Sequence, residues 1–149
     1  MENTETKIHT LGRRRKKSCT LGITIGVFDL FHFGHARFLS RCYDHCDYLM
    51  VGVMSDYWVR VQKGHARPIE SHFARMENVR HYVDNVFLME TLDLTEYLKI
   101  VDVWIKGDGQ INMLPENYPC VYLTRTPGIS TTTLVDNEKN INSNTVLRN

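Results

Sequence analysis

Short apolar, β-rich runs alternate with segments of helical pattern along most of this 149-residue chain. The run 20–26, TLGITIG, predicts a strand closed by glycine, and 34–46 carries apolar residues at helical spacing. Further strands are predicted at 48–54, 85–89, 101–105 and 121–123, and further helices within 68–83, 93–99 and 130–136. This alternation predicts an α/β, Rossmann-like, doubly wound parallel sheet with helices on both faces. Ligands of such folds bind beyond the carboxyl ends of the strands, at a switch in strand order.

The length fits a single domain, which we place at residues 20–136. Residues 1–19 form a polar basic leader that we expect to be flexible, and it contains the block 13–17, RRRKK. A localisation signal or an anionic contact would explain that block, but a solvated tail is the favoured interpretation. Residues 137–149 are rich in asparagine and lack apolar periodicity, so we expect a second flexible tail there.

The composition argues against several classes of protein. The formal net charge is +1, so the bulk charge does not suggest nucleic-acid binding. No apolar run reaches the length of a membrane span. The spacing of the four cysteines matches no zinc template, and no secretory signal is evident. We therefore expect free thiols in the reducing cytoplasm at Cys19, Cys42, Cys46 and Cys120.

The stretch 26–35, GVFDLFHFGH, lies where the first predicted strand ends and the first helix begins. Gly34 lets the backbone approach a ligand, and a helix start presents N–H groups and a positive dipole end to phosphate. His32 and His35 can donate hydrogen bonds to phosphate oxygens there. A metal site is a weaker interpretation, because the pattern offers no third ligand. A capping role would be the default for one lone histidine, but two histidines around a glycine favour phosphate binding.

A second candidate site is the stretch 125–132, RTPGISTT, which follows a predicted strand and opens the last predicted helix. Its serine and threonines can cap that helix, and Arg125 offers a forked cation suited to phosphate. A Ser/Thr-rich cap beside a surface arginine is also a common structural feature.

Both stretches resemble signatures of the cytidylyltransferase family, within the nucleotidyltransferase superfamily: HFGH fits H-x-G-H, and RTPGISTT fits R-T-x-G-I-S-T-[ST]. The resemblance implies that His32 and His35 stabilise charge on the reacting α-phosphate and that Arg125 is also catalytic. It implies further nucleotide contacts within the two motifs, at Gly26, Val27, Phe28, Asp29, Gly34, Thr126, Gly128, Ile129, Ser130, Thr131 and Thr132.

Three segments between the motifs extend the resemblance. In 55–64, SDYWVRVQKG, the family's loop with a catalytic lysine corresponds to Lys63, with Arg60 as a less favoured substitute. The pattern R-P-[IV] followed by a second arginine implies that Arg75 reaches the active site and binds the nucleotide. Gly107 and Asp108 resemble the family's G-D-D turn near the base and ribose.

The resemblance implies an enzyme that transfers CMP from CTP to a small phosphorylated alcohol and releases pyrophosphate. The acceptor phosphate attacks the α-phosphate in line without a covalent enzyme intermediate, while the protein supplies positioning and positive charge. Mg²⁺ should accompany the triphosphate, and no protein metal ligands are predicted. Asp29 is the candidate to orient the first motif or to bind metal through water, although a turn role is equally compatible. A homodimer is implied, involving residues 81–85.

One position narrows the choice of acceptor. Family members that act on choline or ethanolamine phosphate typically carry Asp before the first glycine of the motif, where this chain has Ile25. An acid suits a cationic amine, so glycerol-3-phosphate or a related polyol phosphate is the favoured acceptor. Three alternatives stay open: a choline- or ethanolamine-phosphate enzyme, an adenylyltransferase acting on FMN or a sugar phosphate, and a nucleotide-binding protein without catalysis.

Overall fold

A five-stranded parallel sheet forms the centre of the molecule. The computed structural model describes residues 19–107 and 118–124. The strands lie in the order β3-β2-β1-β4-β5, and every pair is parallel. Their bounds are β1 Leu21–Gly26, β2 Tyr48–Met54, β3 Asn85–Met89, β4 Val103–Gly107 and β5 Cys120–Leu123. The predicted α/β, Rossmann-like class is therefore confirmed.

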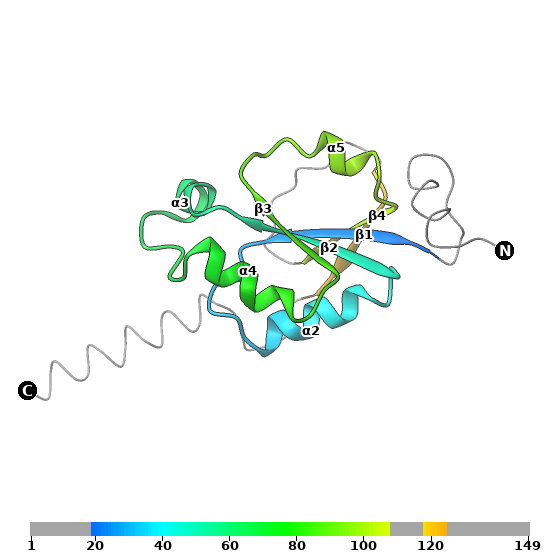
Figure 1. Ribbon diagram of the computed structural model, residues 1–149, viewed down its shortest axis with the longest axis horizontal. Coiled ribbons are helices and arrows are strands. Elements are labelled where there is room, and N and C mark those ends of the chain that lie inside the picture. Colours follow the sequence, from blue (N-terminus) through cyan, green and yellow to red (C-terminus); the bar gives the residue numbers. More distant parts are fainter. Residues whose placement is uncertain (1–18, 108–117, 125–149) are drawn as a thin grey trace, which may run out of the picture.

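The helices cover both faces of the sheet (Figure 1). On one face lie α2, Phe33–Cys42, and α4, His72–Arg80. On the other face lie α3, Asp56–Lys63, and the short α5, Thr95–Leu98. Each face buries its own apolar cluster, and alternate residues of a strand supply the two clusters. In β1, for example, Ile23 and Ile25 pack on the α3 and α5 side.

The strand order reverses at β1. From β1 the chain moves outward through β2 and β3, and it then crosses back to β4 and β5 on the other side of β1. The crevice at the carboxyl ends of β1 and β4 is therefore the switch point, where open parallel sheets bind their ligands. Residues of the first motif follow β1 directly, and Gly107 ends β4.

Several element boundaries differ from the sequence-based prediction. The segment expected to be a loop is helix α3, because Ser55 caps it by accepting a hydrogen bond from the Trp58 N–H and Val59 is buried beneath it. Strand β4 starts at Val103, two residues later than expected. Helix α4 starts only after its cap Ser71. The predicted last helix, the second motif and both predicted tails, except Cys19, lie outside the described residues.

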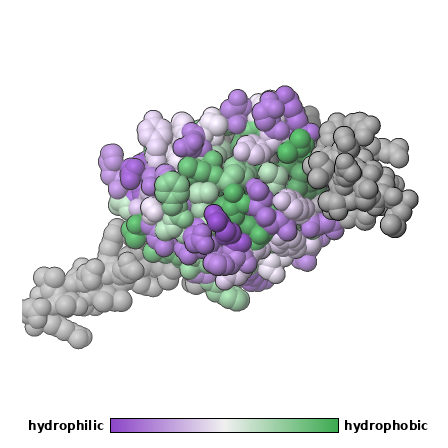
Figure 2. Space-filling model, viewed as in Figure 1, coloured by the Kyte–Doolittle hydropathy of each residue, from purple (hydrophilic) through white to green (hydrophobic). Residues whose placement is uncertain are grey.

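Apolar residues gather across the middle of the molecular face drawn in Figure 2, with polar residues around them. Among the described residues, large apolar side chains with more than half of their surface exposed are Phe33, Tyr57, Val61, Phe73 and Tyr122. In the part of the chain that the structure describes, no helix is long and apolar enough to span a membrane.

Candidate active site

The turn after β1 has a strained backbone that brings the first motif to the switch point. Phe28 and Leu30 have positive φ angles of 56° and 49°, a region that side-chain-bearing residues rarely occupy. The ring of Phe28 folds back over β1, so that a Cβ added at Gly26 would lie 2.8 Å from it. Gly26 is therefore required for this turn. Such strain persists only where surrounding contacts hold it, and it concentrates at functional sites.

His32 and His35 cap helix α2 together. The Gly34 N–H donates to His32 Nδ1 over 3.0 Å, and the His32 N–H donates to His35 Nδ1 over 3.3 Å. The two rings stack with centroids 3.8 Å apart. Because each Nδ1 accepts a hydrogen bond, the neutral form of each ring carries its hydrogen on Nε2. The cap thus fixes the tautomer of both histidines and confirms a capping role for them, and it leaves each Nε2 outside the cap, so that phosphate binding by these rings stays a prediction.

Burial keeps both imidazoles neutral. Desolvation lowers the pKa of His35 to about 3, with the nearby charge of His32 acting in the same direction and that of Asp29 opposing it. Burial also lowers the pKa of His32. The Nε2 atom of His32 is buried and has no hydrogen-bond partner among the described residues. At neutral pH the site therefore offers fixed N–H donors at the start of a helix, where the dipole also favours an anion.

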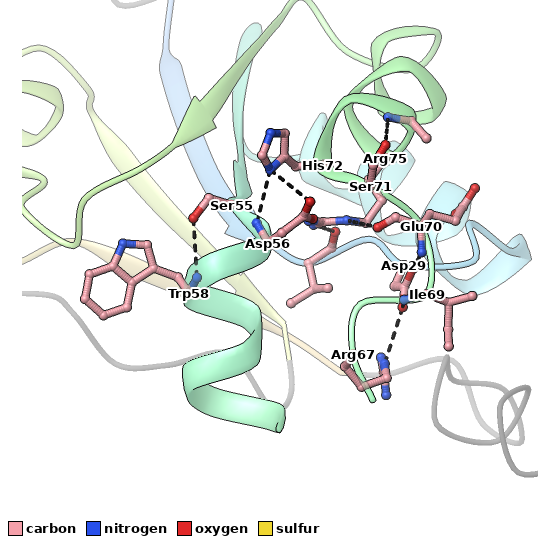
Figure 3. Close-up of polar contacts among 12 residues, drawn as sticks. Asp29, Ser55, Asp56, Trp58, Arg67, Ile69, Glu70, Ser71, His72 and Arg75 are labelled. Atoms are coloured by element: carbon pink, nitrogen blue, oxygen red, sulfur yellow. Dashed lines mark hydrogen bonds and ion pairs between the residues drawn. The ribbon is translucent and has the colours of Figure 1, made fainter. Parts of the chain in front are cut away.

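A second polar cluster locks the turn against the loop before α4 (Figure 3). The carboxylate of Asp29, with 1% of the residue exposed, accepts hydrogen bonds from the N–H groups of Ile69, at 2.7 Å, and Glu70, at 2.9 Å. Arg67 Nε lies 3.3 Å from the same carboxylate. In return Glu70 Oε1 accepts from the Leu30 N–H over 2.9 Å. These reciprocal contacts support the orienting role considered for Asp29.

Arg75 ties three elements together from the first turn of α4. Its guanidinium donates to the carbonyl of Val27 over 2.8 Å, to the carbonyl of Glu70 over 3.1 Å and to Asp56 Oδ1 over 2.7 Å. The residue is fully buried. Asp56 begins α3, and its own N–H donates to His72 on α4 over 3.1 Å. The sequence assigned Arg75 to nucleotide binding, and the structure places its guanidinium on protein groups; direct nucleotide contact stays a prediction.

The predicted catalytic lysine lies on a different layer from the histidines. Lys63 is the exposed last residue of α3, followed by Gly64 with φ of 89°. The histidines lie at the start of α2, on the opposite face of the sheet from α3. The bond from Arg75 to Asp56 connects the start of α3 to the first motif. The catalytic role of Lys63 stays a prediction.

The remaining predicted residues lie at the same edge of the sheet or outside the described residues. A Cβ added at Gly107 would lie 3.0 Å from Phe38, so α2 packs closely on the end of β4. After β5, the carbonyl of Thr124 accepts a hydrogen bond from Arg41 Nη1 of α2 over 3.0 Å. Outside the described residues lie Asp108, Arg125, Thr126, Gly128, Ile129, Ser130, Thr131 and Thr132.

The sequence reasoning missed Glu70 and Asp56 as parts of this site. Both follow recognisable signals, since Glu70 comes after the R-P-I pattern and Asp56 follows the cap Ser55. Neither signal shows which residue, distant in the sequence, is the hydrogen-bond partner of Glu70 or Asp56. Within residues 19–107 and 118–124, no group of three or more His, Cys, Asp or Glu side chains could hold a metal ion.

A cavity of about 420 Å³ lies between the first-motif turn and α4. It is lined by Leu30, Phe31, Glu70, Asn78, His81 and Tyr82. Phe31 stacks on Tyr82 with centroids 5.0 Å apart and also contacts His35 at 5.3 Å. The cavity therefore adjoins the first motif on the side where the sequence implied a dimer contact.

Comparison with known proteins identifies the family of the chain. The family model described as Cytidylyltransferase-like matches residues 23–146. Glycerol-3-phosphate cytidylyltransferase of Bacillus spizizenii is 33% identical over 129 residues, and that of Bacillus subtilis is 36% identical over 117 residues; each match covers 74% of this chain and 90% of the relative. The bifunctional protein HldE of Hyphomonas neptunium is 38% identical over 100 residues, which cover 64% of this chain but 20% of that protein.

A solved structure shows the same fold. The lipopolysaccharide core biosynthesis protein of Thermoplasma volcanium superposes with a TM-score of 0.60 at 23% identity, covering 72% of this chain and 98% of that one. At that identity the likeness supports the fold alone. The family match spans most of the chain and includes both motifs, and the two Bacillus relatives are named cytidylyltransferases. The chain therefore belongs to the cytidylyltransferase-like family and is a nucleotidyltransferase.

Proposed function

We propose that this enzyme transfers CMP from CTP to a small phosphorylated alcohol, with glycerol-3-phosphate as the favoured acceptor. The observation that carries the proposal is the histidine cap, which fixes two neutral rings with Nε2–H donors at a helix start beside the switch point. The names of the two Bacillus relatives support the choice of nucleotide and acceptor. Ile25, which leaves no carboxylate for a cationic amine, supports an acceptor without one.

The reaction requires positioning and charge rather than a protein nucleophile. An oxygen of the acceptor phosphate attacks the α-phosphorus of CTP, a new P–O bond forms, and the bond to the bridging oxygen breaks as pyrophosphate leaves. The Nε2–H groups of His32 and His35 donate to oxygens of the α-phosphate, where charge develops. Lys63 and Arg125 supply positive charge around the triphosphate. Because the rings start neutral, their contribution is hydrogen bonding and not proton uptake.

The other nucleotide contacts are carried by the two motifs. Backbone around Gly26, Val27, Phe28 and Gly34 approaches the nucleotide at the start of α2, and residues 126–132 bind its triphosphate and the neighbouring base or sugar. Gly107 and Asp108 contact the base or ribose at the end of β4. Mg²⁺ would enter with the triphosphate and offset charge on the pyrophosphate, held by phosphate oxygens and water.

We also propose a homodimer in the cytoplasm. The α4 face beside the first motif supports the dimer, because it presents a cavity rimmed by the half-exposed Tyr82 next to the predicted contact 81–85. Four cysteines without disulfides agree with a reducing compartment. Light scattering coupled to size exclusion would decide the oligomeric state, and a monomer at micromolar concentration would refute the dimer.

Pyrophosphate release tests the enzymatic proposal directly. The purified protein with Mg²⁺ is assayed with CTP and with ATP, each paired with glycerol-3-phosphate, phosphocholine, phosphoethanolamine, FMN and a sugar phosphate. Turnover with CTP and glycerol-3-phosphate is the expected result. Turnover with ATP alone would assign the chain to adenylyl transfer, and CTP binding without turnover for any acceptor would indicate a nucleotide-binding protein.

A further inference from the structure

Lys106 is a buried cation at the carboxyl end of β4 to which the proposed mechanism gives no role. Only 2% of the residue is exposed, and it precedes Gly107, the last residue of the strand. Removing an ammonium from water is costly, so a lysine is rarely fully buried unless its charge has partners. Its position at the switch point places that charge where a substrate of this fold would bind.

The strand register places Lys106 beside Ile25. Ile23 of β1 pairs with Trp104 of β4, so continuing both strands by two residues brings Ile25 next to Lys106 on the same face. Ile25 and Trp104 both belong to the apolar cluster under α3 and α5. The face of Lys106 is therefore the face away from α2 and its two histidines.

Aromatic and apolar groups surround this charge. Tyr122 of β5 pairs with Lys106, and the Lys106 ammonium lies 5.5 Å from the centroid of its ring. Cys120 lies two residues earlier in β5, on the same face of the sheet. Burial raises the pKa of its thiol, and the charge of Lys106 acts in the opposite direction. This face of the sheet therefore places one cation beside Ile25, Trp104 and the ring of Tyr122.

We propose that Lys106 selects the acceptor by its head group. Its ammonium donates to a hydroxyl of a polyol or sugar phosphate and repels the ammonium of an amino-alcohol phosphate. The proposal rests on the function proposed above and assigns the acceptor to the α3 and α5 side of the crevice, opposite the triphosphate at the start of α2. An ammonium has three N–H donors, so Lys106 can engage a ligand while keeping contacts within the protein.

Ile25 and Lys106 both favour an acceptor without an amine. Ile25 supplies no negative charge to hold an amine, and Lys106 adds a positive charge that opposes one in a site of low dielectric constant. A hydroxyl is attracted by the same ammonium through a charge-assisted hydrogen bond. One buried cation therefore discriminates twice, by favouring the polyol and by disfavouring the amine.

The test compares Lys106→Met with the wild-type protein in steady-state assays in which CTP and the acceptor are varied separately. Loss of one charge-assisted hydrogen bond predicts a rise of at least about tenfold in KM for glycerol-3-phosphate. The KM for CTP should stay within about twofold, because the proposed place of the triphosphate is the start of α2, on the other face of the sheet. The preference for glycerol-3-phosphate over phosphoethanolamine, expressed as a ratio of kcat/KM values, should fall at least about tenfold.

Lys99→Met is the matched control, since Lys99 is the C-cap residue of α5 with its side chain 61% exposed, and its loss should leave both KM values unchanged. Lys106→Gln keeps a donor without the charge, so it provides the same comparison if the methionine variant does not fold. An unchanged acceptor preference in a folded variant of an active enzyme would overturn this proposal alone. Absence of turnover in the wild-type protein with every nucleotide and acceptor would overturn it together with the proposed function.

Discussion

Two polar clusters meet at the turn after β1, and they differ in what their polar atoms bind. In the network of Asp29, Glu70 and Arg75, the carboxylates and the guanidinium bond to backbone groups and side chains of the protein. In the histidine pair, each Nδ1 is used by the cap while the buried Nε2 of His32 has no partner among the described residues. Buried polar groups that bond within the protein build architecture, and a buried donor held without a partner is prepared for a ligand.

The largest effect expected from this difference is on turnover. His32→Asn should preserve the helix cap, because asparagine is among the best capping residues and its oxygen can accept the Gly34 N–H. It removes the Nε2–H donor, so kcat should fall at least about 100-fold, as for loss of one transition-state donor. Thermal unfolding should be unchanged. Near-normal turnover would show that His32 is only a cap.

His35→Ala removes both the capping nitrogen and the Nε2–H donor, so it serves as the companion variant to His32→Asn. Its kcat should also fall at least about 100-fold. Unlike His32→Asn it should lose about 1 kcal/mol of unfolding free energy, since the N–H of His32 loses its acceptor. Equal stability of the two variants would contradict the cap geometry.

In the network of Asp29, Glu70 and Arg75, a substitution should mainly lower the free energy of unfolding. Arg75→Met leaves the Val27 carbonyl and the Asp56 carboxylate without their guanidinium partner, and breaking such a pair costs about 3 kcal/mol. Urea unfolding measures that loss. Arg80→Met is the control on the same helix, since its ion pair with Glu77 is exposed and should contribute less than about 1 kcal/mol. Full stability of Arg75→Met would show that the network does not hold the turn.

The fold was predictable because its signal is carried by the local pattern. Alternating apolar runs placed all five strands, although β4 begins two residues later than expected. Helix α3 escaped prediction because its eight residues include β-branched and aromatic side chains of low helix propensity and bury only Val59. Its cap, Ser55, is visible in the sequence, but a short helix depends on packing that the sequence does not display.

The site was predictable to the extent that it is local. The two histidines and the glycine between them lie within four residues, so one motif places them at a helix start. The bonds of Arg75 to Val27 and Asp56 join residues 48 and 19 positions apart, and the contact of Lys106 with Tyr122 crosses between strands. Such contacts depend on tertiary structure, which is why the sequence did not show the protein partners of Arg75 and left Lys106 without a role.

The titration of His35 should make the free energy of unfolding depend on pH. The unfolded chain binds a proton at His35 near its ordinary pKa of 6.5, whereas burial lowers the folded value to about 3. The stability contributed by neutral His35 is therefore complete above about pH 6.5 and is lost as the pH falls toward 3. Between pH 7 and pH 5 the wild-type protein should lose on the order of 2 kcal/mol more than His35→Asn, which cannot titrate there. Identical losses in urea unfolding would contradict a buried, neutral His35.

The smallest expected effect is that of Glu70→Gln. Glutamine keeps an oxygen that can accept the Leu30 N–H, but its amide cannot accept the second hydrogen bond, from Asn78 Nδ2. The loss should be about 1 kcal/mol in unfolding free energy, with kcat reduced less than about tenfold, because the turn is loosened while every phosphate donor remains. Glu77→Gln, on the exposed side of α4, is the control and should change neither quantity. If Glu70→Gln lowered turnover as far as His32→Asn and left stability unchanged, Glu70 would belong with the ligand-binding groups. Hydrogen bonding to other protein groups would then not mark a residue as structural.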